Sequence, residues 1–245
     1  MVSADKEYLT GGYLTQEVIR DGNVVRRTSG SHSVFLSAVL KILEEAAYPY
    51  APRYLGRDDA GHDVLEYIPG SISQRGSCEG RSERSYEVAA RMLRELHDIT
   101  SRSALAAEAE CIVHDDVGPF NTIFVDKMPV AFIDWDCARP GNRSSDLGLL
   151  AAHWCILTSS EPDLHLEAQR MASVLKGYDM FDPEELLQAA VTVMRANAEY
   201  SWYRTKLAED NDSFTAAVDA YSWAERCVEH LRANYRFFID QMNRL

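Results

Sequence analysis

The sequence reads IVHDDVGPFN over residues 112–121 and IDWD over residues 133–136. In both stretches apolar residues precede polar ones, which is typical of short strands that end in polar loops. Asp116, Asn121 and Asp134 all stand in these loops. Phosphoryl transfer needs such a set: a carboxylate for the proton of the attacking hydroxyl, and oxygen ligands that hold Mg²⁺ on nucleotide phosphates. We therefore expect the three side chains to converge on one site.

Each of these residues also has an ordinary explanation. Asp and Asn are common in turns, and Asp134 alone can cap a strand. The spacing of Asp116 and Asn121 around Gly118 and Pro119 indicates a tight turn, which lets the first side chain face an acceptor and the second reach a metal ion. The joint spacing favours the catalytic interpretation over three unrelated turn residues.

The residues before this stretch predict a small antiparallel sheet with one helix. Asp21 and Gly22 form a hairpin signal between apolar runs, and residues 33–43 have apolar side chains at helical spacing. Further strands are expected near 53–56 and 63–68.

Pro69 and Gly70 end the last of these strands, and we take them as a boundary between two lobes. The chain then divides into an N-terminal lobe, residues 1–69, and a C-terminal lobe, residues 70–245. Apart from the strands around the polar loops, the second lobe is expected to be helical. Its later helices are predicted at 144–157, 164–177, 182–208 and 213–242. The fold class is therefore α+β.

Composition restricts the class of protein. Hydrophobic residues make up 46% and charged residues 26% of the 245, as in an ordinary globular protein. No apolar run is long enough to cross a bilayer, and the first residues lack the pattern of a signal peptide, so we expect a cytoplasmic protein without membrane contact. The 38 acidic against 25 basic residues give a net charge of −13, which argues against nucleic acid as a partner. The five cysteines form no C-x-x-C pair, so no zinc site is expected.

The stretch from His114 to Leu147 resembles the catalytic core of the aminoglycoside phosphotransferase and choline kinase family. Members share H-x-D-x-x-x-x-N, then I-D-W/F-[DE], then D-L. This sequence fills the pattern with His114, Asp116, Asn121, Asp134, Trp135, Asp136, Asp146 and Leu147. Weaker similarity extends to Leu93–His97, to the strand Val64–Gly70 and to the hairpin Leu9–Arg27. The resemblance implies a protein-kinase-like fold of two lobes, a small antiparallel sheet with one helix and a larger, mostly helical lobe.

The same resemblance implies roles for the residues of the two loops. Asp116 would be the catalytic base, and Asn121 and Asp134 would hold Mg²⁺. His114 would brace the loop, and Asp146 would accept hydrogen bonds from it. ATP or GTP would be the phosphate donor.

The residues expected to bind the nucleotide depart from the family pattern. The family places a cation, usually Lys, on the third strand, whereas this sequence has only Arg26 and Arg27 there. Because side chains alternate along a strand, only one of the two can face the phosphates, and we favour Arg26, which shares a face with Val24. The helix that follows has no acid until Glu44, so the usual ion pair with this cation is expected to be absent.

Backbone groups complete the predicted nucleotide site. Gly11 and Gly12 would let the chain approach the phosphates, although a glycine pair also suits a plain turn. Glu66, Tyr67 and Ile68 would read the adenine through main-chain groups.

The acceptor is a small molecule with a hydroxyl group, and a cationic compound such as an aminoglycoside is one candidate. Glu199, Tyr200, Trp202 and Tyr203 combine an acid with aromatic rings that suit an amine, although such a cluster more often belongs to the core or to helix–helix packing. His153, Trp154 and Trp223 are interpreted as packing residues. Two other functions stay open: a nucleotide-binding pseudo-kinase without transfer activity, and a kinase for a metabolite of the choline, homoserine or sugar type. A monomer or a homodimer is expected.

Overall fold

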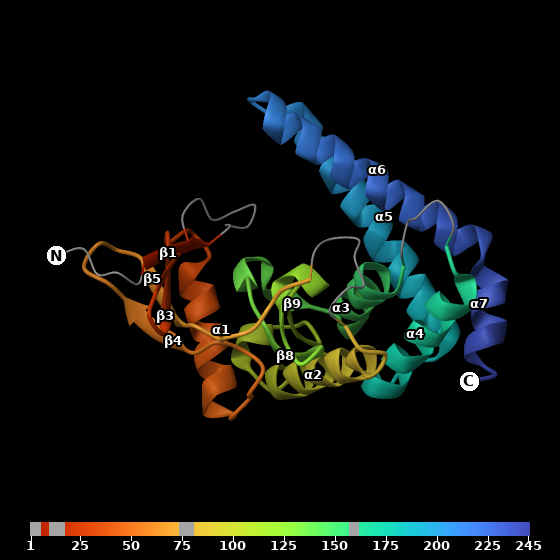
Figure 1. The fold of residues 1–245 in the computed structure, drawn as a ribbon, viewed down its shortest axis with the longest axis horizontal. Coiled ribbons are helices and arrows are strands. Elements are labelled where there is room, and N and C mark those ends of the chain that lie inside the picture. The colour runs from red at the N-terminus through yellow and green to blue at the C-terminus, as the bar shows by residue number, and fades with distance from the viewer. Residues whose placement is uncertain (1–5, 10–17, 74–80, 157–161) are drawn as a thin grey trace.

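The computed structural model describes residues 6–9, 18–73, 81–156 and 162–245. A small antiparallel sheet with one helix lies at the N-terminal end of the molecule, and a larger, mostly helical part carries the C-terminus (Figure 1). The α+β class predicted from the sequence is confirmed.

The sheet has five strands in the order β1-β2-β3-β5-β4, and all neighbours are antiparallel. The strands are β1 (Lys6–Leu9), β2 (Val18–Asp21), β3 (Val24–Arg27), β4 (Tyr54–Arg57) and β5 (Asp63–Glu66). The predicted hairpin between β2 and β3 turns at Gly22, whose φ of 62° suits glycine. Helix α1 (Ser33–Glu45) buries Leu36, Leu40 and Leu43, in agreement with the helical spacing read from the sequence.

The helical part is built from α2 (Arg84–Thr100), α3 (Arg143–Leu150), α4 (Leu164–Tyr178), α5 (Pro183–Leu207), α6 (Asn211–Ala233) and α7 (Tyr235–Met242). The single helix predicted over 213–242 is two helices. The Asn234 side chain donates to the His230 carbonyl over 2.9 Å, which satisfies the end of α6 and lets the chain turn into α7. The helix predicted over 144–157 changes after Leu150 into one turn of π-helix, Ala151–Cys155.

Four short strands interrupt the helices and hold the polar loops. β6 (Cys111–Val113) pairs with β9 (Arg139–Gly141), and β7 (Thr122–Val125) pairs with β8 (Met128–Phe132). Sequence reasoning does not predict strand β9, because Pro140 argues against a strand. Two short 3-10 helices lie in the polar loops: η2 (Pro119–Asn121) directly before β7, and η3 (Trp135–Cys137) directly after Asp134.

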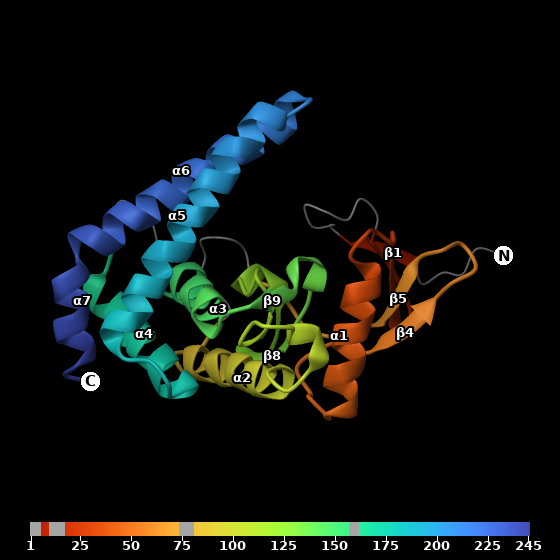
Figure 2. The same ribbon diagram turned by 180° about the vertical axis from the view of Figure 1, so that it is seen from behind.

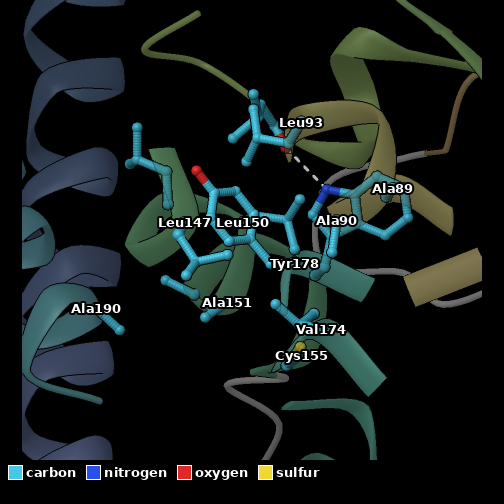
Figure 3. Close-up of a cluster of buried hydrophobic side chains, with 14 of the residues drawn as sticks. Ala89, Ala90, Leu93, Leu147, Leu150, Ala151, Cys155, Val174, Tyr178 and Ala190 are labelled. Atoms are coloured by element: carbon cyan, nitrogen blue, oxygen red, sulfur yellow. Dashed lines mark hydrogen bonds between the residues drawn. The ribbon is translucent and has the colours of Figure 1, made fainter. Parts of the chain in front are cut away.

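The main core lies where α2, α3, α4, α5 and the π-helical turn meet (Figure 3). Its labelled side chains are Ala89, Ala90, Leu93, Leu147, Leu150, Ala151, Cys155, Val174, Tyr178 and Ala190. Small residues let the helices approach closely. A Cβ on Gly177 of α4 would overlap the Glu87 carbonyl of α2, and one on Gly148 of α3 would lie 2.6 Å from the Ala189 backbone of α5.

Helices α5 and α6 pack along each other as a long pair that extends away from the other helices (Figures 1 and 2). Helix α5 begins with a capping box: the Asp182 side chain accepts from the Glu185 N–H, Glu185 bonds back, and Pro183 stands at the first helical position. None of the helices in the described part of the chain combines the length and apolar character needed to span a membrane.

Candidate active site

The loop between β6 and β7 brings Asp116 and Asn121 into contact. The side-chain amide of Asn121 donates to the Asp116 carboxylate Oδ2 over 2.7 Å and to the Asp116 carbonyl over 3.1 Å. The Gly118 N–H donates to the same carbonyl over 2.8 Å and closes the turn. A Cβ at position 118 would overlap the Phe120 ring, so a larger residue there would require this ring to move. Because both amide bonds use Nδ2, Oδ1 is the Asn121 atom suited to a metal ion.

Asp134 joins this loop through the backbone. The N–H of the preceding residue, Ile133, donates to the Asn121 carbonyl over 2.9 Å. Asp134 itself has φ 61° and ψ 63°, a left-handed conformation that costs a residue with a side chain about 1 kcal/mol. Strained residues of this kind cluster at functional sites. The structure therefore brings Asp116, Asn121 and Asp134 together from two loops.

The local charge balance fits a divalent cation beside Asp134. Burial raises the pKa of Asp134 above its ordinary value, and the carboxylates of Asp136 and Asp116 raise it further, while Arg27 acts in the opposite direction. Carboxylate and amide oxygens are hard ligands of the kind that Mg²⁺ prefers. In the described ranges no three His, Cys, Asp or Glu side chains gather as a metal site. A site with few protein ligands is usual for Mg²⁺, which keeps waters and substrate phosphates.

Buried groups behind the loop fix its shape. The Asp146 carboxylate accepts the His114 N–H over 2.7 Å and the Asp115 N–H over 2.8 Å, and it lies 3.0 Å from His97 Nε2. Burial raises the pKa of Asp146, but the hydrogen bonds and charge of His97 and the His114 N–H outweigh it, so the pKa is lowered overall. The structural role expected for Asp146 is confirmed.

His114 braces the loop from the side of β8, as expected. Its Nε2 lies 3.0 Å from the Ile133 carbonyl, and its ring packs against Trp135 at 4.6 Å between centroids. Burial lowers the pKa of His114, so the ring is neutral near pH 7. A neutral ring bonded to a carbonyl carries its proton on Nε2, which fixes the tautomer.

Asp115 is directed away from its neighbour Asp116. Both of its carboxylate oxygens accept from Arg139, over 2.7 and 2.8 Å. Its φ of 64° turns the backbone between the two acids. The adjacent carboxylates are therefore separated, with Asp116 bonded to Asn121.

The two arginines of β3 lie on opposite faces, and Arg27, not the favoured Arg26, lies beside Asp134 and Asp136. Arg26 pairs with Asp21 over 2.6 Å and with Asp58 over 3.4 Å. Arg27 is buried, bonds the Asp136 carboxylate and has its Nη1 3.8 Å from Asp134 Oδ1. Strand alternation predicts that only one arginine reaches the loops, but it does not tell which one.

Two of the three backbone N–H groups in the predicted adenine site already donate to other backbone carbonyls. The Glu66 N–H donates to the Arg53 carbonyl and the Tyr67 N–H to the Asn23 carbonyl, each over 2.9 Å. Within the described residues the Ile68 N–H has no such bond, so it is the donor of the three that remains for a ligand. Gly11 and Gly12 lie outside the described residues.

Sequence reasoning missed an aromatic wall next to the loop. His153 of the π-helical turn stacks on Trp223 of α6 at 4.7 Å, and Phe120 meets the His153 ring edge-on at 5.4 Å. Trp154 points the other way and donates to the Val117 carbonyl over 2.8 Å. Because π-helical turns recur at functional sites, the change in helix type is itself a signal, but no local sequence pattern reveals it.

The aromatic cluster predicted on α5 is not packed into the core. Tyr200, Trp202 and Tyr203 are 62%, 52% and 56% exposed, and Trp202 lies 5.4 Å from Tyr221 of α6. These residues stand near the C-terminal end of α5.

One segment of the chain matches a known protein family, and one curated relative is similar in sequence. Residues 100–179, which include His114, Asp116, Asn121 and Asp134, match the model of the phosphotransferase enzyme family. The trifolitoxin immunity protein of Rhizobium leguminosarum bv. trifolii is 32% identical over 166 residues. That match spans 61% of this chain and 61% of the relative.

Solved structures confirm the kinase-like fold. A choline/ethanolamine kinase family protein from Mesorhizobium loti matches with a TM-score of 0.65 at 17% identity, covering 94% of this chain and 93% of that one. The streptomycin-ATP-APH(2")-IIa ternary complex matches with a TM-score of 0.58 at 17% identity, covering 91% and 93%. At such identity the likeness is one of fold. The predicted resemblance to aminoglycoside phosphotransferases and choline kinases is therefore confirmed.

Proposed function

We propose that the chain is a small-molecule phosphotransferase, which moves the γ-phosphate of ATP or GTP to a hydroxyl group of a small acceptor. One observation carries the proposal. Asn121 bonds the carboxylate of Asp116 and, through its carbonyl, the backbone before Asp134, and this arrangement lies within the segment that matches the phosphotransferase family model.

Asp116 would accept the proton of the attacking hydroxyl, and the Asn121 amide would hold its carboxylate in orientation. Asn121 Oδ1 and Asp134 would hold Mg²⁺, which neutralises charge on the transferred group when bound. The buried Arg27 would contact the phosphates in place of Arg26, and the Ile68 N–H would meet the adenine. Catalysis then depends mainly on positioning and electrostatics, because phosphoryl transfer leaves the protein little covalent chemistry.

The division of labour along the chain follows from these roles. Residues 1–69 would bind nucleotide, and residues 70–245 would supply the catalytic loop and the acceptor site. The wall formed by Phe120, His153 and Trp223 would line the acceptor, since Phe120 directly precedes Asn121. Stacked rings suit a planar or cationic group. A cytoplasmic location, where ATP and GTP are available, belongs to the same proposal.

The test is a coupled nucleoside diphosphate assay with Mg²⁺ and a panel of acceptors: aminoglycosides, choline, ethanolamine, homoserine and sugars. Because one relative is a trifolitoxin immunity protein, a toxin that carries a hydroxyl group also belongs in the panel. Asp116→Asn should lower kcat by about a thousandfold, in line with the loss of a general base, and leave nucleotide affinity within about twofold. Full activity of this variant contradicts the role of Asp116.

Two results separate the alternatives. Binding of Mg-nucleotide without transfer to any acceptor favours a pseudo-kinase. Preferred transfer to choline, homoserine or a sugar, rather than to an aminoglycoside or a toxin, identifies a metabolite kinase.

A further inference from the structure

Helix α1 does not supply an acid for the β3 arginine. Its acidic residues are Glu44 and Glu45, at the far end of the helix, and its first turn has none. The first residue, Ser33, instead donates its hydroxyl to the buried carboxylate of Asp63 on β5. The helix is therefore tied to the sheet by a polar contact that does not involve the phosphate-binding arginine.

A carboxylate from the other part of the molecule contacts this arginine. Arg27 Nη2 donates to Asp136 Oδ1, and the two residues are 6% and 7% exposed. Asp136 lies in η3, two residues after Asp134. Since a buried guanidinium needs a charged partner, the pair fixes Arg27 relative to the catalytic loops.

We propose that Asp136 is the positioning residue for Arg27 and takes the part of the missing helix acid, so that Arg27 presents its remaining N–H groups to phosphate oxygens of the nucleotide. This inference rests on the proposed function. It assigns Asp136 a role that acts through Arg27, and it makes the arginine a bridge between β3 and η3.

The hydrogen-bond donors of Arg27 support the role proposed for Asp136. Among the described residues its Nε is buried and has no hydrogen-bond partner, and its Nη1 stands 3.8 Å from Asp134, beyond hydrogen-bond distance. Buried donors are almost always satisfied, so an orphaned N–H beside the proposed metal ligand points to an oxygen-bearing anion. A guanidinium has five donors in a fixed fork and can bond a carboxylate and a phosphate at once. This geometry gives a physical reason for Arg, rather than Lys, at this position.

The test is a double-mutant cycle in which the dissociation constant of MgADP is measured by calorimetry. The proteins are wild type, Asp136→Asn, Arg27→Gln and the double variant, in which a neutral pair replaces the ion pair without leaving one buried charge alone. Each single change should weaken MgADP binding by about tenfold, and the double variant should bind about as weakly as Arg27→Gln alone. Lys176→Gln, which breaks an exposed pair with Glu87, is the matched control and should bind like wild type.

The possible results are distinct. If Asp136→Asn weakens binding by the same factor with and without Arg27, Asp136 acts independently, as a metal ligand would, and the proposal is wrong. An unchanged affinity of Asp136→Asn in the wild-type background also overturns it. If the wild-type protein does not bind MgADP, the proposed function is wrong. This result does not depend on any of the variants. Thermal unfolding of all four proteins shows whether weaker binding follows from loss of fold, which the neutral double variant is designed to avoid.

Discussion

The proposed catalytic loop, residues 114–121, and the β3–α1 region form two sides of the same candidate site. The loop keeps the residues of the family pattern, whereas the β3–α1 region departs from it. The loop keeps the residues of H-x-D-x-x-x-x-N: the Asn121 amide donates to the Asp116 carboxylate, and the backbone N–H of His114 donates to the Asp146 carboxylate, as the resemblance implies for Asp146. In the β3–α1 region the helix acid of the family pattern is absent, and Asp136 of η3 contacts Arg27 instead.

The difference shows which kind of contact a sequence pattern can specify. Asp116 and Asn121 are five residues apart, so their contact follows from the geometry of one turn. Arg27 and Asp136 are 109 residues apart, and their contact depends on how the sheet packs against the helical part. Four measurements test this comparison, in order of decreasing expected effect.

The largest effect is expected on the loop side, at Asp146. Asp146→Asn removes a buried charge that accepts two backbone N–H groups, and it should lower the free energy of unfolding by about 3 kcal/mol. The pKa of Asp146 is lowered in the folded state, so its contribution is complete above its unfolded pKa of about 3.9 and is lost as the pH falls through the lower folded value. Urea unfolding from pH 7 to pH 3 should therefore show a shallower loss of stability in acid for the variant. A decrease in the free energy of unfolding of less than about 1 kcal/mol at pH 7 contradicts the role of Asp146 in fixing the shape of the loop.

The second measurement compares the two arginines on the sheet side. Arg27→Gln should weaken MgADP binding by about tenfold, whereas Arg26→Gln, which breaks partly exposed pairs with Asp21 and Asp58, should change it by less than about twofold. Calorimetric titration of both variants measures the difference. Equal losses of MgADP affinity in the two variants would contradict the proposal that Arg27, and not Arg26, contacts the nucleotide.

The third measurement extends the comparison to the acceptor. Trp223→Ala removes the ring that stacks on His153 and should raise the KM for the acceptor by about five- to tenfold, the value of one aromatic contact, with the KM for ATP unchanged. Steady-state kinetics with each substrate varied in turn separates the two constants. A change confined to the KM for ATP would place this wall on the nucleotide side.

The smallest effect is expected at the exposed end of α5. Tyr203 is 56% exposed, so Tyr203→Ser should change the free energy of unfolding by less than about 0.5 kcal/mol. Chemical denaturation measures this change. A larger loss would show that the ring is packed in solution, as the alternative interpretation of this cluster holds.

The sequence predicts most of the elements and the loop side of the site, because both depend on local spacing. The cap at Asp182 and the hairpin at Gly22 are examples in which residue type alone determines the geometry. The break at Asn234 escapes sequence reasoning because the apolar spacing continues on both sides of it.

The other features that the sequence does not predict are contacts between residues that lie far apart in the chain. The choice between Arg26 and Arg27 depends on the twist and packing of β3, which alternation does not define. The stacking of His153 on Trp223 needs a π-helical turn and a distant helix to meet. Neither leaves a periodic signal in the sequence.

The bond from the Ile133 N–H to the Asn121 carbonyl bears on how the site tolerates evolutionary change. It joins the open ends of the hairpin formed by β7 and β8, while the tip of that hairpin, at Asp126 and Lys127, lies at its opposite end. Extra residues inserted at the tip would lengthen the hairpin without separating Asn121 from Asp134. Variation in chain length is therefore compatible with an unchanged arrangement of the two proposed metal ligands, provided that it is confined to the tip.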